Sequence, residues 1–530
     1  MKNLTRITLV IQLCLFVLLS LSHTALAKSR SKKKITKDVK EVNICDLERR
    51  DIPIYCYCIN HHMKNSTDAN CVVFNKFDID DPIWSHFASQ PSIDKLTFTV
   101  KHSGSFTYVP TQALKQLKNL QVVTVQYAKI HEIVEHAFSN MSSIVEINLS
   151  RNMIFVLKKW AFENMKNLSI VNLDENRIAE VNRDVFINLP SLRKLFLNRN
   201  NITILHDKAF KHLNSLQELE LSGNHISVIT SDSFNGLSGL TRLDLRSNLI
   251  SMIGDRSFVE MPELRELELD QNQIEYISEK ALDGMRNLRK LRLSENKLVN
   301  LEPNFLAGAT SVYFLDLRDN ALRTMTFDNI KPIVTNLYDA TSYFYLDDNK
   351  LICDCKLAWI WGLRNETKNL KLRDSLEVLT CFMETKNATV ALNEEAERNR
   401  ALEIARNQEQ YESDKSRLSQ DSANYMDDGA DYEEYDLYDS PNPETGSRVE
   451  VIEGKIGVMK HLFELKLEEL PCPEPSREDL MASEQPSSRH GHAQYGSSGT
   501  RATLSLTKIS LIITHCVLSF GFLLNELFFT

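Results

Sequence analysis

The chain has 530 residues, a formal net charge of −9 at pH 7 and 42% hydrophobic residues. The negative charge is concentrated in residues 393–448, which argues against a nucleic-acid-binding surface, because such surfaces are basic. The motifs G-x-S-x-G and H-E-x-x-H and a phosphate-binding loop are absent from the sequence. We therefore predict a protein that is not an enzyme and that holds no cofactor or metal.

The first residues have the pattern of a secretory signal. Lys2 and Arg6 precede an apolar run, and Ala25-Leu26-Ala27 forms a small-x-small cleavage site. The apolar run is shorter than the roughly twenty residues that a membrane anchor needs. We predict that residues 1–27 are removed on export. Residues 28–44 then form a basic, flexible leader, which either binds glycosaminoglycan and other anionic surfaces or has no binding role.

Four cysteines follow the leader: Cys45, Cys56, Cys58 and Cys71. An exported chain folds in an oxidising compartment, which favours disulfides over the alternative of a zinc site. Four cysteines allow three pairings, and the sequence does not choose among them. We assign residues 45–92 to a cysteine-rich N-terminal cap.

An asparagine recurs every twenty-four residues through the middle of the chain. These residues are Asn152, Asn176, Asn200, Asn224, Asn248, Asn272, Asn296 and Asn320. Around Asn224, Leu216, Leu219, Leu221 and Ile226 complete the pattern L-x-x-L-x-L-x-x-N-x-I, which resembles the leucine-rich repeat signature. Phenylalanines repeat with the same period: Phe138, Phe162, Phe186, Phe210, Phe234 and Phe258, with Leu282 next.

The spacing of the apolar residues explains how such copies fold. Leu219 and Leu221 have strand periodicity and share one side, while Glu220 points to the other side. One strand cannot bury its apolar side alone, so stacked copies form a parallel sheet, and each buried asparagine amide must bond to backbone groups of adjacent turns. We predict an α/β repeat solenoid over residues 93–352: a leucine-rich-repeat horseshoe of about eleven units, with the sheet on its concave face and disulfide-stapled caps.

Outward positions of the predicted sheet form the candidate binding face, because neighbouring strands lie about 4.8 Å apart. One column alternates in sign: Lys194, Glu218, Arg242, Glu266 and Lys290. The next contains Phe196, Glu220, Asp244, Glu268, Arg292 and Asp316, and an aromatic group follows at Tyr313, Phe314, Tyr343 and Tyr345. Opposite charges on adjacent strands can simply stabilise the sheet. Alternatively, a face with both signs pairs with a two-fold copy of itself.

Seven N-glycosylation sequons remain after signal removal: Asn65, Asn140, Asn148, Asn167, Asn201, Asn365 and Asn387. Asn148 lies between Ile147 and Leu149, so it is predicted to project from the concave sheet. A glycan on Asn148 would cover the N-terminal part of that face.

A second group of cysteines follows the repeats: Cys353, Cys355, Cys381 and Cys472. We assign residues 353–475 to a C-terminal cap that seals the open end of the solenoid. Residues 393–448 are polar and acidic, and we predict a disordered insertion there. Its tyrosines Tyr425, Tyr432, Tyr435 and Tyr438 lie among acids, a context that suits sulfation as well as a bare solvated segment.

The C-terminal residues resemble a lipid-anchor signal. Small residues at 496–499 precede a polar spacer and an apolar tail that contains Asn525 and Glu526 and no basic flank. This favours a glycosylphosphatidylinositol anchor on Ser497, or on Gly496 or Ser498, over a spanning helix. Residues 476–497 then form a linker, and residues 498–530 are removed.

The C-terminal cap, with Cys353-Asp354-Cys355 and the region from Trp359 to Trp361, resembles extracellular leucine-rich-repeat caps. That resemblance implies pairing of Cys353 with Cys381 and of Cys355 with Cys472. The signal, caps, repeats and tail together resemble arthropod-type leucine-rich-repeat adhesion proteins of the cell surface. The resemblance implies homophilic adhesion in neuronal and muscle target recognition, from the outer leaflet of the cell membrane. The alternatives are a receptor or co-receptor for a secreted ligand and an extracellular matrix protein.

Overall fold

The computed structural model describes residues 42–47, 52–59, 65–102, 104–385, 449–452 and 454–472. The predicted signal, most of the leader, the acidic insertion, the linker and the anchor tail lie outside these residues. So do Asn387 and the predicted anchor residues Gly496, Ser497 and Ser498.

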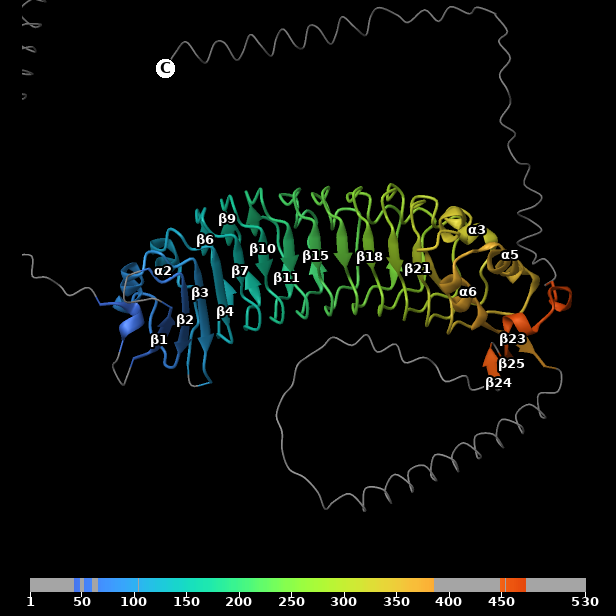
Figure 1. Cartoon of the computed structure of the whole chain (residues 1–530), viewed down its shortest axis with the longest axis horizontal. Coiled ribbons are helices and arrows are strands. Elements are labelled where there is room, and N and C mark those ends of the chain that lie inside the picture. Colours follow the sequence, from blue (N-terminus) through green and yellow to red (C-terminus); the bar gives the residue numbers. More distant parts are fainter. Residues whose placement is uncertain are drawn as a thin grey trace, which may run out of the picture. The chain divides into compact units, whose positions relative to one another are not determined.

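The described residues form stacked coils, each of which contributes one strand to a 13-stranded main sheet (Figure 1). Its strands, in spatial order, are β1 (Ile54–Cys58), β2 (Asp68–Val73), β3 (Lys95–Val100), β4 (Val122–Gln126), β7 (Glu146–Asn148), β10 (Ile170–Asn172), β13 (Lys194–Phe196), β15 (Glu218–Glu220), β16 (Arg242–Asp244), β18 (Glu266–Glu268), β20 (Lys290–Arg292), β21 (Phe314–Asp316) and β22 (Tyr343–Tyr345). The pair β1 and β2 is antiparallel, and β2 pairs in parallel with β3. Eleven strands from β3 to β22 belong to successive coils. This arrangement confirms the predicted solenoid.

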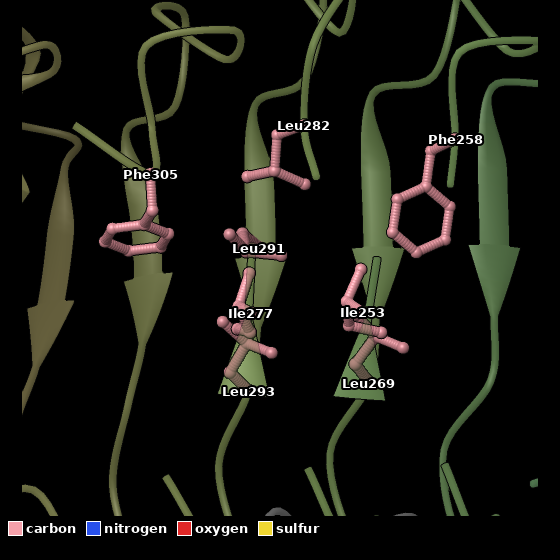
Figure 2. Close-up of a pocket in the computed structure, with 8 residues that line it drawn as sticks. All are labelled: Ile253, Phe258, Leu269, Ile277, Leu282, Leu291, Leu293 and Phe305. Atoms are coloured by element: carbon pink, nitrogen blue, oxygen red, sulfur yellow. The ribbon is translucent and has the colours of Figure 1, made fainter. Parts of the chain in front are cut away.

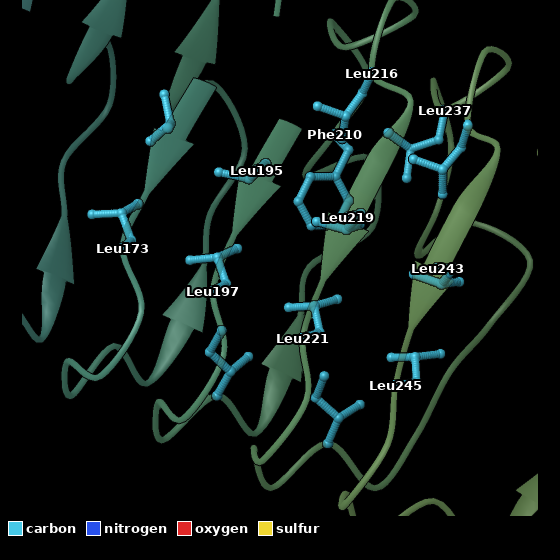
Figure 3. Close-up of a cluster of buried hydrophobic side chains, with 14 of the residues drawn as sticks. Leu173, Leu195, Leu197, Phe210, Leu216, Leu219, Leu221, Leu237, Leu243 and Leu245 are labelled. Atoms are coloured by element: carbon cyan, nitrogen blue, oxygen red, sulfur yellow. The ribbon is translucent and has the colours of Figure 1, made fainter. Parts of the chain in front are cut away.

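Alternation along each strand builds the core. In β15, Leu219 is fully buried while Glu218 and Glu220 on either side are partly exposed. Leu219 lies in register with Leu195 and Leu243 on the adjacent strands, so the leucines form continuous columns inside the stack (Figure 3). Each coil therefore buries its apolar side against its neighbours, as nearest-neighbour stacking requires.

The predicted asparagine ladder forms inside the stack. The Asn224 amide nitrogen donates to the carbonyl oxygens of Leu197 and Leu221 at 3.0 and 2.9 Å, and its amide oxygen accepts from the Ile202 N–H at 3.0 Å. One side chain thus satisfies three buried backbone groups on two coils. Where Ala128 replaces the asparagine, its own N–H donates to the Asn152 amide oxygen at 2.7 Å, so the ladder begins one coil later.

The phenylalanine column fills the return side of the coils. Phe138, Phe162 and Phe186 lie on the short parallel strands β6 (Phe138–Ser139), β9 (Phe162–Glu163) and β12 (Phe186–Ile187). Their rings stack with centroids 5.3 and 5.2 Å apart. Leu282 interrupts the column and leaves an apolar cavity of about 10 Å³ between Phe258 and Phe305 (Figure 2). Because only apolar side chains line this cavity, it is a packing gap of the core.

A third set of short strands lies on the flank of some coils, between the main sheet and the return side. These parallel pairs are β5 (Glu132–Ile133) with β8 (Val156–Leu157), β11 (Glu180–Val181) with β14 (Ile204–Leu205), and β17 (Met252–Ile253) with β19 (Tyr276–Ile277). Helices occur near the ends of the stack: α2 (Thr111–Gln116), α3 (Phe327–Ile330), α4 (Val334–Leu337), α5 (Trp359–Glu366) and α6 (Leu370–Glu377). None of the described helices is long and apolar enough to cross a membrane.

The N-terminal cap is joined to the repeats through β1 and β2. Disulfides connect Cys45 with Cys58 and Cys56 with Cys71, a choice that the sequence left open. The 3₁₀ helices η1 (Ile44–Asp46) and η3 (Pro82–Ser89) cover the end of the stack. Ile44 is fully buried. The cap therefore already includes the last residue of the segment that we assigned to the leader.

The C-terminal cap combines α5 and α6 with a separate antiparallel sheet in the order β23 (Thr380–Glu384), β25 (Lys455–His461) and β24 (Val449–Ile452). Short 3₁₀ helices complete it at η4 (Cys355–Leu357), η5 (Leu462–Glu464) and η6 (Leu467–Glu469). Its disulfides join Cys353 to Cys381 and Cys355 to Cys472, the pairing that the resemblance implied. The chain thus returns after residue 448 to complete the cap.

Candidate binding face

The outward side chains of β13 to β22 form the candidate binding face. Strand register places Lys194, Glu218, Arg242, Glu266, Lys290, Phe314 and Tyr343 in one column. The adjacent column contains Phe196, Glu220, Asp244, Glu268, Arg292, Asp316 and Tyr345. Each column crosses one strand at every step, so side chains of consecutive repeats are direct neighbours.

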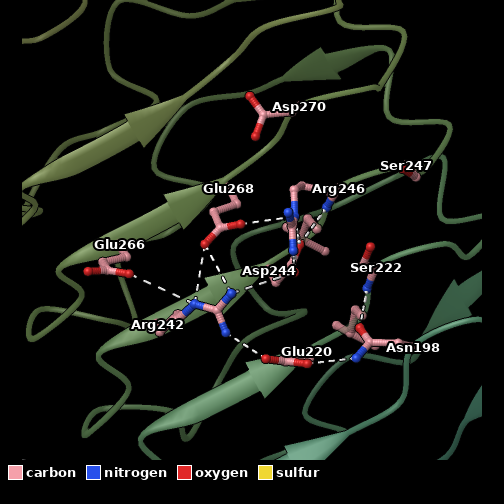
Figure 4. Close-up of polar contacts among 12 residues, drawn as sticks. Asn198, Glu220, Ser222, Arg242, Asp244, Arg246, Ser247, Glu266, Glu268 and Asp270 are labelled. Atoms are coloured by element: carbon pink, nitrogen blue, oxygen red, sulfur yellow. Dashed lines mark hydrogen bonds and ion pairs between the residues drawn. The ribbon is translucent and has the colours of Figure 1, made fainter. Parts of the chain in front are cut away.

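Arg242 is the centre of a charge network in the middle of the face (Figure 4). Its guanidinium lies 2.8 Å from Glu218, 2.5 Å from Glu220 and 3.1 Å from Glu268. Burial alone lowers the pKa of Arg242, but the surrounding carboxylates, Glu268 and Glu220 first, outweigh it and raise that pKa. The positive charge of Arg242 is therefore balanced by carboxylates of its own chain.

The flanking lysines extend the same pattern. Lys194 lies 2.7 Å from Glu218, and Lys290 lies 2.8 Å from Glu266. Burial opposes the ionisation of Glu218, yet Lys194 and Arg242 hold its pKa below the usual value. In the central part of the face, the alternating signs thus pair across adjacent strands, which favours the sheet-stabilising explanation there.

Two predicted face residues are on the outward side but cannot be reached. Asp244 is 1% exposed and Asp316 is 0% exposed. Arg246 and Arg318 cover them, each with its guanidinium 2.7 Å from the carboxylate. A partner would contact the two arginines, so Asp244 and Asp316 are not part of the contact surface.

An aromatic cluster occupies the C-terminal end of the face. Phe314, Tyr343 and Tyr345 have ring centroids 5.5 to 6.1 Å apart. Within the described repeats, Tyr313 takes no part in these ring contacts, because it precedes β21 and has the opposite parity to Phe314. All three rings of the cluster are half-buried, so each keeps a surface for a partner.

Cations lie over these rings. Arg292 lies 4.7 Å from the Phe314 centroid, and Arg318 lies 4.7 Å from that of Tyr345. Lys371 of α6 lies 5.2 Å from the Tyr343 centroid, and its ammonium donates to the Tyr343 hydroxyl at 3.0 Å. The cluster therefore presents flat rings and positive charge together, the side-chain types enriched at interface hot spots.

The structure adds a third outward column, two residues before each ladder asparagine. It contains Ser150, Asp174, Asn198, Ser222, Arg246, Asp270, Ser294, Arg318 and Asp347. Several members link coils: Asp270 accepts from the Ser294 N–H at 3.0 Å, and Asn198 accepts from the Ser222 N–H at 2.8 Å. Our sequence reasoning missed this column although its parity matches the two predicted columns. That parity is the signal that would have found it.

Burial changes the titration of two carboxyl groups in this third column. It raises the pKa of both Asp174 and Asp270 to about 6, against the opposing backbone hydrogen bonds that each accepts. Neighbouring acids, Glu220 for Asp174 and Asp316 for Asp270, raise these values further. Both groups therefore titrate near neutral pH.

The repeats of this chain are similar to those of known proteins. A leucine rich repeat family model matches residues 166–226, 219–274 and 262–322. Connectin of Drosophila melanogaster is 58% identical over 339 residues, which are 63% of this chain and 50% of that protein. The chain is a leucine-rich-repeat protein similar to connectin. It spans about half the length of this curated relative.

Solved structures of leucine-rich-repeat proteins are also similar. One is the TLR13–ssRNA13 complex, with 24% identity, a TM-score of 0.44 and coverage of 49% of this chain and 37% of that chain. Another is the Drosophila Toll–Spatzle complex, with 20% identity, a TM-score of 0.42 and coverage of 56% and 44%.

The sequons of this leucine-rich-repeat chain are distributed unevenly. Asn148 lies in β7 on the same side of the sheet as the candidate face, and its amide oxygen accepts from the Ser150 N–H at 3.0 Å. Asn65, Asn140, Asn167, Asn201 and Asn365 are exposed. No sequon occurs in residues 202–364. The aromatic cluster thus lies in the half of the repeats that carries no sequon.

The described residues offer no metal site. Within the ranges given above, no group of three or more His, Cys, Asp or Glu side chains is arranged to hold a metal ion. The eight cysteines of the caps are all paired in disulfides. The face presents aromatic surface, cations and hydrogen-bonding groups.

Proposed function

We propose that this protein is a cell-surface adhesion molecule that binds a copy of itself on the apposed cell through the C-terminal part of the candidate face. The aromatic cluster under Arg292, Arg318 and Lys371 carries this proposal. Similarity to connectin over 339 residues supports an adhesive role, and neuronal and muscle target recognition is the setting that the family resemblance implies.

The contrast between the two parts of the face directs the contact to its C-terminal end. Charges around Arg242 are already matched within the chain, so bringing a second copy near them gains little. The cations of the aromatic cluster also lie over rings of their own chain, but these rings are half-buried and keep surface that a partner can cover. A two-fold copy can bring its own rings and cations against that surface. An isologous contact of this kind needs only one type of surface.

We further propose that a lipid anchor holds the protein in the outer leaflet of the cell membrane. The small residues at 496–499 and the apolar tail after them support this. Treatment of expressing cells with a phosphatidylinositol-specific phospholipase should release the protein into the medium. Retention of all of the protein after treatment would contradict the anchor.

Aggregation of suspended cells tests the adhesive function. Cells that express the protein should cluster with one another and should exclude cells without it. Expressing cells that stay single would contradict the proposal. A monomeric ectodomain that captures a secreted ligand would instead support a receptor function.

Two variants test whether cell clustering requires the aromatic cluster in particular or any exposed aromatic side chain. Tyr345→Ala should reduce clustering strongly. Tyr57→Ala, which removes a tyrosine that is 62% exposed in the N-terminal cap, should leave clustering unchanged. Equal clustering by both variants would exclude the aromatic cluster as the contact.

A further inference from the structure

A row of exposed apolar side chains runs along the flank of the coils, away from the candidate face. Ile204, Val228, Met252 and Tyr276 each lie four residues after a ladder asparagine and are 51, 66, 54 and 44% exposed. We call these four residues the flank row. The same position holds Glu180 in the coil before and an exposed Asn300 in the coil after. Four consecutive repeats therefore expose apolar groups where their neighbours expose polar ones.

Buried neighbours in the core fix the position of the flank row. The residue after each member, namely Leu205, Ile229, Ile253 and Ile277, is buried in the core. Ile253 and Ile277 point inward, towards Leu269 and Leu293 (Figure 2). Met252 and Tyr276 are in register on β17 and β19. With about 4.8 Å between successive coils, as between the strands of the main sheet, the row forms an apolar strip of about 14 Å.

The borders of the strip carry no charge at its centre. Ser227 and Ser251 lie on one side of Val228 and Met252, and Thr230 and Gly254 lie on the other side. At these bordering positions, charged or titratable residues occur at the two ends, as His206 and Glu275, while His225 and Asp255 lie beyond Ser227 and Gly254. A strip of this kind can face an identical strip without bringing like charges together.

We propose that the flank row joins two copies of this chain side by side on the same membrane. This proposal rests on the proposed lipid anchor. Two chains anchored in one membrane are related by a two-fold axis normal to that membrane. In a pair whose coil stacks lie side by side and point the same way, this axis is parallel to the stacks. Each coil then meets the same coil of its partner, and Val228 faces Val228. Self-facing coils of the candidate face would instead oppose Arg242 to Arg242, so the uncharged strip suits this symmetry.

The size of the strip sets the strength of the contact. A stable complex buries about 800 Å² on each partner, and four side chains on a strip of about 14 Å cover much less. The pairing is therefore weak in solution and forms where an anchor confines the chains to one surface. The sequon Asn201 lies in the coil of Ile204 and borders the strip, whereas the coils of Val228, Met252 and Tyr276 carry no sequon.

Cysteine crosslinking on intact cells tests the symmetry directly. In the full chain, Val228→Cys should form a disulfide-linked dimer under mild oxidation, because the two-fold axis brings residue 228 next to itself. Ser238→Cys, an exposed position in the coil of Val228 that follows the return-side Phe234 and lies away from the flank row, is the matched control. The dimer fraction at residue 228 should exceed the control several-fold. Equal crosslinking at both positions, or a monomer at residue 228, would overturn the proposal.

A second variant guards against a folding artefact. Met252→Glu added to Val228→Cys places a charge in the strip without touching the core, so surface expression should persist while the dimer is lost. Persistence of the dimer would overturn the proposal, as would release of wild-type protein from the cells without any lipase. Clustering of wild-type cells reports on the proposed adhesion separately. If cells fail to cluster while Val228→Cys still crosslinks, adhesion fails and the side-by-side pair stands.

Discussion

The inward and outward sides of the main sheet follow opposite rules. Inside, the same residue returns in nearly every coil, and Leu195, Leu219 and Leu243 are interchangeable members of one column. Outside, the column that holds Arg242 changes from charged to aromatic between Lys290 and Phe314. Repetition is required where a side chain must fit its own copies above and below. Variation is free where the neighbour is solvent or a partner, so function has to be sought among the outward residues that break the pattern.

The largest expected effect is in the core that the inward side faces. Phe210→Ala removes a fully buried ring and leaves a cavity, which should cost about 3 to 5 kcal/mol of unfolding free energy. Phe314→Ala removes a half-buried ring from the outward side and should cost much less. Urea-induced unfolding of the two purified variants measures both. Similar losses would remove the distinction between the two sides of the sheet.

A substitution in the asparagine ladder should lower the unfolding free energy almost as much. Asn224→Ala leaves the Ile202 N–H and the carbonyl oxygens of Leu197 and Leu221 without their side-chain partner, at a cost of about 2 to 4 kcal/mol. The outward Asn198→Ala is the matched control, because its partners border solvent. Thermal unfolding should place the Asn224 variant well below the control. A reversed order would contradict the structural role of the ladder.

Removing the central charge should have an intermediate effect. Arg242→Met leaves Glu218, Glu220 and Glu268 close together without their shared cation. Because the network is partly exposed, we expect a loss of about 1 to 2 kcal/mol, reduced by added salt. Lys290→Met, which breaks one exposed pair with Glu266, should cost under about 1 kcal/mol. Unfolding at low and high ionic strength separates the two variants. A loss that salt does not reduce would indicate packing as its cause.

The last effect depends on pH. Because the pKa of Asp270 is raised to about 6 in the folded protein, its stabilising contribution is complete below about pH 4 and is lost as the pH rises through 6. Asp270→Asn keeps an acceptor for the Ser294 N–H, as Asn198 does for Ser222, and cannot ionise. Relative to wild type, the variant should therefore gain about 2 kcal/mol between pH 4 and pH 7. A difference in stability that does not vary with pH would show that Asp270 does not titrate in this range.

The sequence predicts the inward side far better than the outward side. A period of twenty-four residues fixes which residues stack, so the ladder and the leucine columns follow from the pattern. The same period places Asp244 and Asp316 on the outward side, but it does not show that Arg246 and Arg318 cover them. Side-chain length and direction decide that outcome. The separation of Tyr313 from the aromatic cluster was missed for a simpler reason, since a shift of one residue reverses the side of the sheet.

The leucine-rich-repeat pattern also did not predict the flank row. Val228 and Met252 lie next to Ile229 and Ile253, and two adjacent apolar residues look like core until burial separates them. Only the structure shows that one member of each pair is exposed. The sequence also did not predict the disulfide pairing in the N-terminal cap, because the spacing of four cysteines does not determine which of them are bonded.

The central claim is that adhesion depends on the aromatic cluster and not on the charges of the central face. The most direct measurement is clustering of cells that express either Tyr343→Ala/Tyr345→Ala or Lys194→Met/Lys290→Met, at matched surface levels. The account predicts that the tyrosine variant loses clustering and that the lysine variant keeps it. Clustering that survives loss of both tyrosines, or that disappears with the two lysines alone, would contradict it.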